Sequence, residues 1–90
     1  MQAKITIIGA GLTGLTLAYL LKRENFDFQI LEARPRLGGR IFTKMSGNHI
    51  PIDLGAAWLW DYNPQMKSLL AELKLEIFPQ IMGNTVWYQQ

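Results

Sequence analysis

The sequence predicts an α/β fold that opens with a parallel β-α-β unit, and three observations lead to this prediction. An apolar, β-branched run at residues 4–8 is followed at once by three spaced glycines. Residues 12–24 carry apolar side chains at helical spacing, and residues 26–31 return to a strand-like pattern. A strand, a glycine turn, a helix and a second strand within about 30 residues make up a β-α-β unit.

The first strand and helix have clear limits in the sequence. Residues 4–8, KITII, are apolar at nearly every position, which predicts a strand buried on both faces, as in a parallel sheet. The helix that follows places one set of side chains on its apolar face: Leu15, Ala18, Tyr19 and Leu21. Asn25 then tolerates the left-handed conformation that often ends a helix.

The sequence from residue 41 onward predicts a hairpin, a second helix and a further hairpin. Residues 41–44 and 49–54 read as short strands joined by a turn at 45–48. Asn63 and Pro64 suit the N-cap and first position of a helix whose body is 65–75. The tail from residue 76 to 90 is expected to form two strands around Gly83-Asn84.

Composition excludes several classes of site and partner. With 90 residues the chain is one small domain, and the lack of cysteine excludes disulfides, thiolate metal sites and thiol nucleophiles. A net charge of +2 is too small for a nucleic-acid footprint. The apolar runs are shorter than the roughly 20 residues needed to span a bilayer. No metal, nucleic acid or transmembrane segment is expected, and a cytoplasmic location is the default.

The three glycines have a chemical meaning in this context. Gly9, Gly11 and Gly14 form G-x-G-x-x-G directly after a strand and at the start of a helix. The first glycine makes the tight turn, the second lets a pyrophosphate approach the backbone, and the third brings the helix close to the strand. The helix N-terminus then offers free N–H groups to the phosphates. The unit is therefore expected to be a Rossmann-like dinucleotide-binding fold.

A carboxylate at the end of the second strand also indicates dinucleotide binding. Glu32 stands at the end of the second strand, 18 residues after Gly14, near the spacing of a ribose-binding carboxylate. It can accept hydrogen bonds from both ribose hydroxyls and would repel a 2′-phosphate, which argues against NADP. FAD and NAD share this adenosine diphosphate half, so both cofactors remain possible from these residues.

The next blocks of sequence resemble the flavin-containing amine oxidase superfamily, which includes monoamine and polyamine oxidases, protoporphyrinogen oxidase and phytoene desaturase-like enzymes. The match consists of the glycine pattern, Glu32-Ala33, Gly38-Gly39-Arg40 and the block IDLGAAWLW at 52–60. The resemblance implies FAD as cofactor, with no catalytic residue in this chain. It implies that the cofactor is held by Gly9, Gly11, Leu12, Thr13, Gly14, Glu32, Arg34, Gly38, Gly39, Arg40, Ala56, Ala57 and Trp58.

The resemblance also implies that much of such an enzyme lies elsewhere. Residues 1–75 are expected to be the N-terminal FAD-binding segment, and residues 76–90 the start of a truncated substrate domain. The domain is then incomplete, and the chain alone should bind FAD weakly or not at all and should not turn over substrate. A small-molecule substrate is expected only for the full-length enzyme, and the fragment is expected to self-associate.

Two other hypotheses stay open on the residues alone. One is an NAD-binding module of a dehydrogenase, which would use the same glycines and Glu32. The other is a non-catalytic module that uses a nucleotide-binding fold for assembly.

Overall fold

The structure is a computed structural model that describes residues 4–80. By its internal contacts the chain divides after Trp58 into two compact units. Within the described residues, no helix is both long and apolar enough to cross a membrane.

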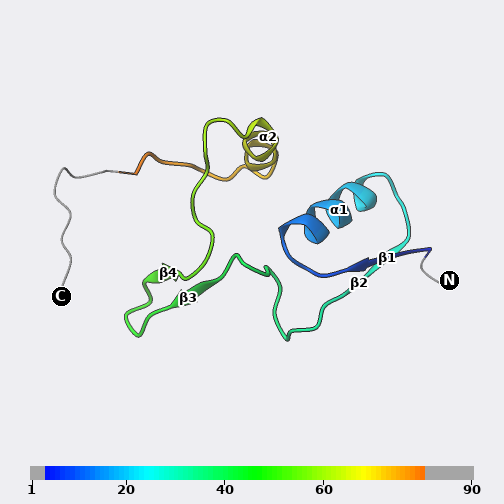
Figure 1. Ribbon diagram of the computed structural model, residues 1–90, viewed down its shortest axis with the longest axis horizontal. Coiled ribbons are helices and arrows are strands. Elements are labelled where there is room, and N and C mark those ends of the chain that lie inside the picture. Colours follow the sequence, from blue (N-terminus) through cyan, green and yellow to red (C-terminus); the bar gives the residue numbers. More distant parts are fainter. Residues whose placement is uncertain (1–3, 81–90) are drawn as a thin grey trace. The chain divides into compact units, whose positions relative to one another are not determined.

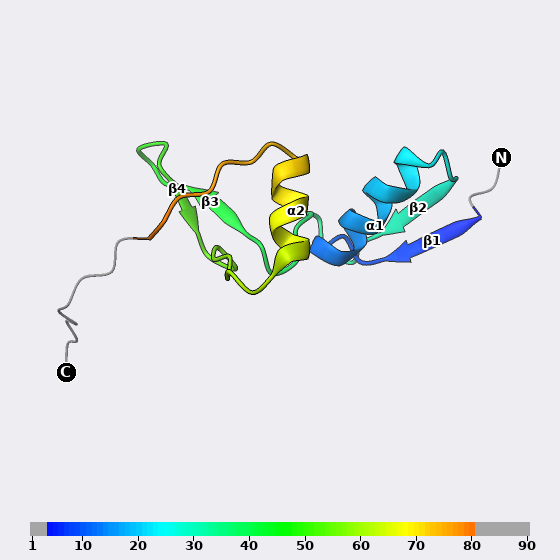
Figure 2. The ribbon, with the colours of Figure 1, turned by 90° about the horizontal axis from the view of Figure 1, so that it is seen from above.

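The first unit begins with the predicted β-α-β arrangement (Figure 1). Strand β1 (Ile5–Ile8) leads through the glycine turn into helix α1 (Leu12–Arg23), and strand β2 (Phe28–Leu31) follows. The two strands pair in parallel, from Ile5 opposite Phe28 to Ile8 opposite Leu31. Both arrows accordingly point the same way in Figure 2. The prediction of an α/β, Rossmann-like fold is confirmed.

Only one face of this two-stranded sheet is covered, so the prediction of a strand buried on both faces is wrong. Ile7 is 6% exposed and faces α1, whereas its neighbour Ile8 is 78% exposed. On the open face Gln29 donates a side-chain hydrogen bond to the Thr6 hydroxyl across the strands. The apolar run in β1 therefore reflects a sheet that needs a second covering layer, which the described residues of this unit do not supply.

Helix α1 ends as its sequence predicts. Asn25 adopts the left-handed conformation with φ 60°. Its N–H donates to the Lys22 carbonyl, and the Phe26 N–H donates to the Leu21 carbonyl, which together form a Schellman motif. This tight ending turns the chain back so that β2 can run parallel to β1.

The predicted hairpin follows the β-α-β unit. Strand β3 (Thr43–Met45) pairs antiparallel with strand β4 (Pro51–Asp53). The pairing extends beyond the strands, because the Leu54 N–H donates to the Phe42 carbonyl and the Ala56 N–H to the Arg40 carbonyl. The hairpin thus carries the Gly-Gly-Arg loop and the alanine-tryptophan block alongside each other.

The second unit contains helix α2 (Pro64–Glu72). Asn63 caps it as predicted, because its side-chain oxygen accepts from the Met66 N–H at 3.1 Å. The helix ends earlier than the predicted residue 75, because Lys74 turns left-handed with φ 57°. Residues 76–80 form no strand, and the predicted turn at Gly83-Asn84 lies outside the described residues.

Candidate functional site

The three glycines of the first turn differ in how far their surroundings require glycine. Gly9 has φ 98°, a conformation that side chains other than glycine rarely adopt. At Gly14 a Cβ atom would collide with the Gly9 carbonyl oxygen and press on Ile7 at 3.2 Å. A Cβ at Gly11 would meet only the Gly39 Cα, at an ordinary 3.8 Å, and the φ of Gly11 is −82°. Among the described residues, therefore, nothing requires glycine at position 11.

The N-terminus of α1 is open to an anion. Gly11 is its N-cap and offers no side-chain hydrogen bond, and the first turn contains no acidic residue. The first amides of a helix have no acceptor within the helix and carry a partial positive charge. The exposed residues Leu12 and Thr13 lie on this turn. The end of the helix can therefore receive phosphate oxygens.

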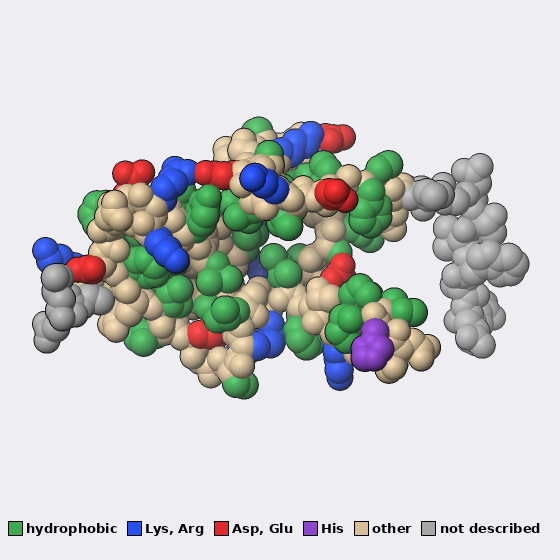
Figure 3. Space-filling model, turned by 180° about the vertical axis from the view of Figure 1, so that it is seen from behind, with side chains coloured by type: hydrophobic (Ala, Val, Ile, Leu, Met, Phe, Trp, Pro, Cys, Tyr) green, Lys and Arg blue, Asp and Glu red, His purple; other side chains and the backbone are tan. Residues whose placement is uncertain are grey.

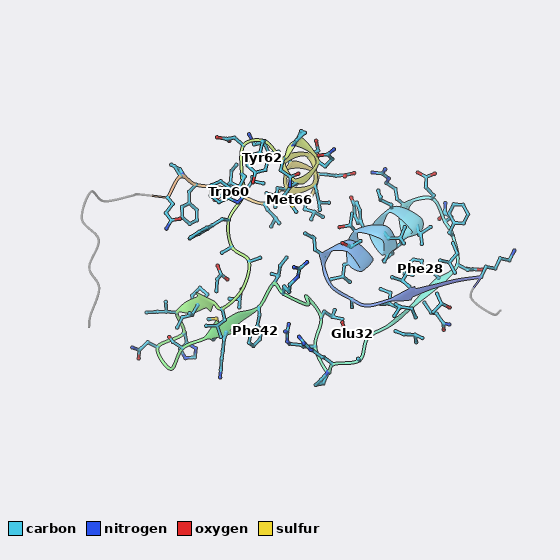
Figure 4. All side chains as sticks on the ribbon, viewed as in Figure 1. Phe28, Glu32, Phe42, Trp60, Tyr62 and Met66 are labelled. Carbon is cyan, nitrogen blue, oxygen red and sulfur yellow. The ribbon has the colours of Figure 1, made fainter. Side chains whose placement is uncertain are left out.

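Glu32 lies at the end of β2, beside this turn (Figure 4). One of its carboxylate oxygens accepts from the Ala10 N–H at 3.0 Å, and the other accepts from the Arg34 N–H at 2.9 Å. The Arg34 amide first, then the Ala10 amide, holds the pKa of Glu32 below its ordinary value. The side chain is thus ionised near neutral pH and fixed in direction.

The Gly38-Gly39 loop packs against the same turn. The Gly38 N–H donates to the Ala10 carbonyl at 2.8 Å, and Gly11 and Gly38 form an isolated parallel bridge. Gly38 and Gly39 both have positive φ, 104° and 60°. A Cβ at Gly39 would lie 3.1 Å from the Gly11 Cα. The loop therefore forms a wall of the site made of bare backbone.

The last predicted block, residues 56–58, is connected to the Gly-Gly-Arg loop through the hairpin. The Ala56 N–H donates to the Arg40 carbonyl at 3.1 Å, so the two segments lie side by side. A Cβ at Gly55 would collide with that same carbonyl oxygen. Ala57 and Trp58 follow Ala56 in the chain and are exposed, Trp58 by 70%.

The structure thus brings most of the predicted residues together by backbone contacts, and it adds three that the sequence reasoning missed. Ala10 is fully buried and bonds to both Glu32 and Gly38. Gly55 and Arg36 hold the loops in place. The small residue between two glycines was a readable signal for Ala10. No pattern in a single sequence marks Gly55 or Arg36. Gly55 meets Arg40 across the hairpin, and the contacts of Arg36, although near in sequence, depend on the folded shape of the loop.

The chemistry of the site is recognition. It presents free amides, a fixed carboxylate and bare backbone, which suit the phosphates and ribose of a dinucleotide. Within residues 4–80 there is no group of three or more histidine or acidic side chains that could hold a metal ion. The residues fit the phosphates and ribose of a dinucleotide.

Comparison with known proteins agrees with this geometry. The family described as NAD(P)-binding Rossmann-like domain matches residues 7–73. The chain is 34% identical over 91 residues to probable polyamine oxidase 4 of Arabidopsis thaliana, covering 98% of this chain and 18% of that protein. It is 33% identical over 94 residues to probable flavin-containing monoamine oxidase A of Dictyostelium discoideum, covering 94% of this chain and 20% of that protein.

The solved structures give the same result. The structure of putrescine oxidase bound to putrescine superposes with a TM-score of 0.75 at 33% identity, over 84% of this chain and 17% of that one. This chain spans about a fifth of the length of the two oxidases named above. On this evidence the chain belongs to the NAD(P)-binding Rossmann-like domain family, in the group that contains the flavin-containing amine oxidases.

Proposed function

We propose that this chain is the FAD-binding portion of an amine-oxidase-like, flavin-dependent oxidoreductase. The observation that carries the proposal is the Glu32 carboxylate, held by two backbone amides beside the open end of α1. Each carboxylate oxygen has two lone pairs and uses one on an amide, so each retains one for a ribose hydroxyl. The adenosine ribose and the pyrophosphate then bind within one turn of chain.

The proposed position of the ribose and pyrophosphate gives the other site residues their roles. Gly9, Gly11, Leu12, Thr13 and Gly14 would surround the pyrophosphate. Arg34 would flank the ribose, and Gly38, Gly39 and Arg40 would face the diphosphate and ribityl chain. Ala56, Ala57 and Trp58 would approach the flavin ring. The contacts of Glu32 and Gly38 with Ala10, and of Ala56 with Arg40, support this assignment.

FAD is favoured over NAD for two reasons. The relatives at 33–34% identity are named as polyamine oxidase and flavin-containing monoamine oxidase. A dehydrogenase module also has no need of the Gly38-Gly39-Arg40 loop that packs on Gly11. In the whole enzyme the flavin would supply the redox chemistry on a small amine, while this chain binds and orients it.

The test is an NMR titration of the ¹⁵N-labelled chain with FAD, NAD⁺ and NADP⁺. FAD is expected to bind weakly and to move the amide signals of residues 9–14, 32–34 and 38–40. NADP⁺ should bind more weakly than NAD⁺, because Glu32 repels its 2′-phosphate. The variant Glu32→Gln should lose binding, whereas Glu24→Gln, which removes an exposed carboxylate at the end of α1, should retain it.

The outcomes separate the alternatives. NAD⁺ binding without FAD binding would favour a dehydrogenase module. Normal FAD binding by Glu32→Gln would exclude the ribose role and favour a non-catalytic nucleotide-fold module. Tight, stoichiometric FAD binding would show that the chain needs no further part of an enzyme to hold its cofactor.

A further inference from the structure

We propose that Arg36 is a positioning residue, which holds the Gly38-Gly39 loop in the shape that the dinucleotide meets. The inference rests on the proposed function and adds to it a residue outside the expected set of cofactor contacts. The three arginines of the loop differ in how far they are buried. Arg36 is half-buried, while Arg34 and Arg40 are exposed.

The guanidinium of Arg36 spans the glycine turn. One of its terminal nitrogens, Nη2, donates to the Gly39 carbonyl at 2.8 Å, and the other, Nη1, donates to the Leu37 carbonyl at 3.3 Å. The planar, forked group thereby ties together the carbonyls on either side of Gly38. An ammonium on a flexible stem does not reproduce this two-pronged geometry.

The same guanidinium lies on an aromatic ring. Its central carbon is 4.4 Å from the centre of the Phe42 ring, within the range of a cation–π contact. Phe42 is itself anchored, because its carbonyl accepts the Leu54 N–H at 2.7 Å. Figure 4 labels Phe42 just before β3. Arg36 thus connects the glycine loop to the stem of the hairpin.

This connection matters because two consecutive glycines are the most mobile backbone a chain can have. Gly38 and Gly39 must keep positive φ angles for Gly39 to lie against Gly11 and for the Gly38 amide to reach Ala10. Without Arg36, the loop would sample other conformations, and a dinucleotide would have to order it on binding. The affinity would then fall although Arg36 itself does not touch the ligand.

The test compares four variants of the full chain: Arg36→Lys, Arg36→Ala, Phe42→Leu and Arg23→Ala. Arg23→Ala is the matched control, because it removes one positive charge from an exposed position at the end of α1. Two quantities are measured, hydrogen exchange of the Gly38 and Ile41 amides without ligand, and the Kd for FAD by NMR titration. The Gly38 amide donates to Ala10 in the neighbouring turn, and the Ile41 amide donates to Gly38 within the loop.

Arg36→Lys and Arg36→Ala should each speed exchange at these two amides and weaken FAD binding, by about tenfold for loss of the charged hydrogen bonds. Phe42→Leu removes only the cation–π contact, so its effects should go in the same direction and be smaller. Arg23→Ala should change neither quantity. If Arg36→Lys behaves like Arg36→Ala, the loop depends on the forked geometry of the guanidinium and not on the positive charge alone.

Wild-type behaviour of Arg36→Lys in both measurements would overturn the inference. Weaker FAD binding with unchanged exchange would also overturn it, because Arg36 would then contact the ligand directly. If Glu32→Gln lost binding while the Arg36 variants kept it, the proposed function would stand and this inference would fall. If the wild-type chain bound NAD⁺ and not FAD, the proposed function would fail. Unchanged exchange in the Arg36 variants would separately reject the proposal that Arg36 holds the loop.

Discussion

Glu32 combines two duties at the scale of a single residue. Its carboxylate joins the end of β2 to the turn between β1 and α1 through the Ala10 amide, and it is the acceptor proposed for ribose. The first duty exists without any ligand. Stability and binding are therefore both expected to depend on its ionisation.

The pH dependence of stability should reveal the first duty. Because the Arg34 and Ala10 amides lower the pKa of Glu32 in the folded chain, its stabilising contribution is complete above the ordinary pKa of glutamate, about 4.3. That contribution is lost as the pH falls through the lowered, folded-state pKa. The free energy of unfolding, measured with urea between about pH 3 and pH 7, should fall less on acidification for Glu32→Gln than for the wild type.

Glu24→Gln serves as the control for that series, since Glu24 is an exposed carboxylate at the C-cap of α1. Its acid profile should match that of the wild type. Identical profiles for Glu32→Gln and the wild type would mean that the negative charge of Glu32 adds nothing to stability through its two amide hydrogen bonds.

Gly11 and Gly14 should separate binding from folding. Alanine at Gly14 meets the Gly9 carbonyl and should lower the free energy of unfolding by about 1–3 kcal/mol, as overpacking does. Alanine at Gly11 meets only ordinary contacts and, as an N-cap change, should reduce stability by less than about 1 kcal/mol. FAD binding should nevertheless be lost in Gly11→Ala, because its methyl group occupies the path of the pyrophosphate.

The measurements are urea unfolding and the NMR titration with FAD for both variants. A Gly11→Ala chain that is folded and still binds FAD like the wild type would remove the pyrophosphate from this turn.

At the scale of an element, the two helices end by the same device with different residues. Each closes with a Schellman motif, around Asn25 in α1 and around Lys74 in α2. Asparagine accepts the left-handed conformation readily, whereas lysine is strained there by about 1 kcal/mol. The sequence consequently predicts the end of α1 correctly and places the end of α2 too late.

Opposite changes at the two ends of α2 should have opposite effects. Lys74→Gly relieves the strained conformation and should stabilise the helix by roughly 1 kcal/mol. Asn63→Ala removes the acceptor for the Met66 N–H and should destabilise it by about 1 kcal/mol. Hydrogen exchange of the α2 amides reports both, with slower exchange expected in the first variant and faster exchange in the second. Equal exchange in the two variants would contradict the capping account.

At the scale of the whole molecule, the dominant feature is apolar surface. Only Ile7, Ala10 and Ala18 form the buried apolar core of the described residues, and many large apolar side chains are exposed. Figure 3 shows such side chains spread over the visible surface. Ile8 and Leu31 are neighbours on the open face of the sheet, 78% and 52% exposed. An open parallel sheet of this kind normally has both faces covered.

We therefore propose that the isolated chain self-associates through this open face. Ile8→Lys combined with Leu31→Lys should shift the chain toward monomer in sedimentation velocity, because charge on the face opposes its burial. Gln65→Lys with Ser68→Lys adds the same two charges at exposed polar positions of α2 and leaves the open face of the sheet intact, so it serves as the control. A wild-type chain that sediments as a monomer at high concentration would argue against the proposal.

Part of this protein is determined locally, and the sequence reveals that part. The glycine turn, the left-handed Asn25, the Asn63 cap and the hairpin each depend on the conformational preferences of a few adjacent residues. The order of these elements was sufficient to predict a dinucleotide-binding β-α-β unit and to place Glu32 next to its turn.

The tertiary structure decided what depends on distant contacts. That Gly11 is required by no neighbour among the described residues, and that Ala10 is the buried centre of the turn, follow from residues brought together across the fold. The contacts by which Arg36 braces the glycine loop are near in sequence, but only the folded shape of the loop sets their geometry. The burial of β1 on one face rather than two also depends on which layers are present, not on the strand's own residues. Local preferences fix elements, whereas packing partners separated in the sequence fix which side chains are covered and which support the site.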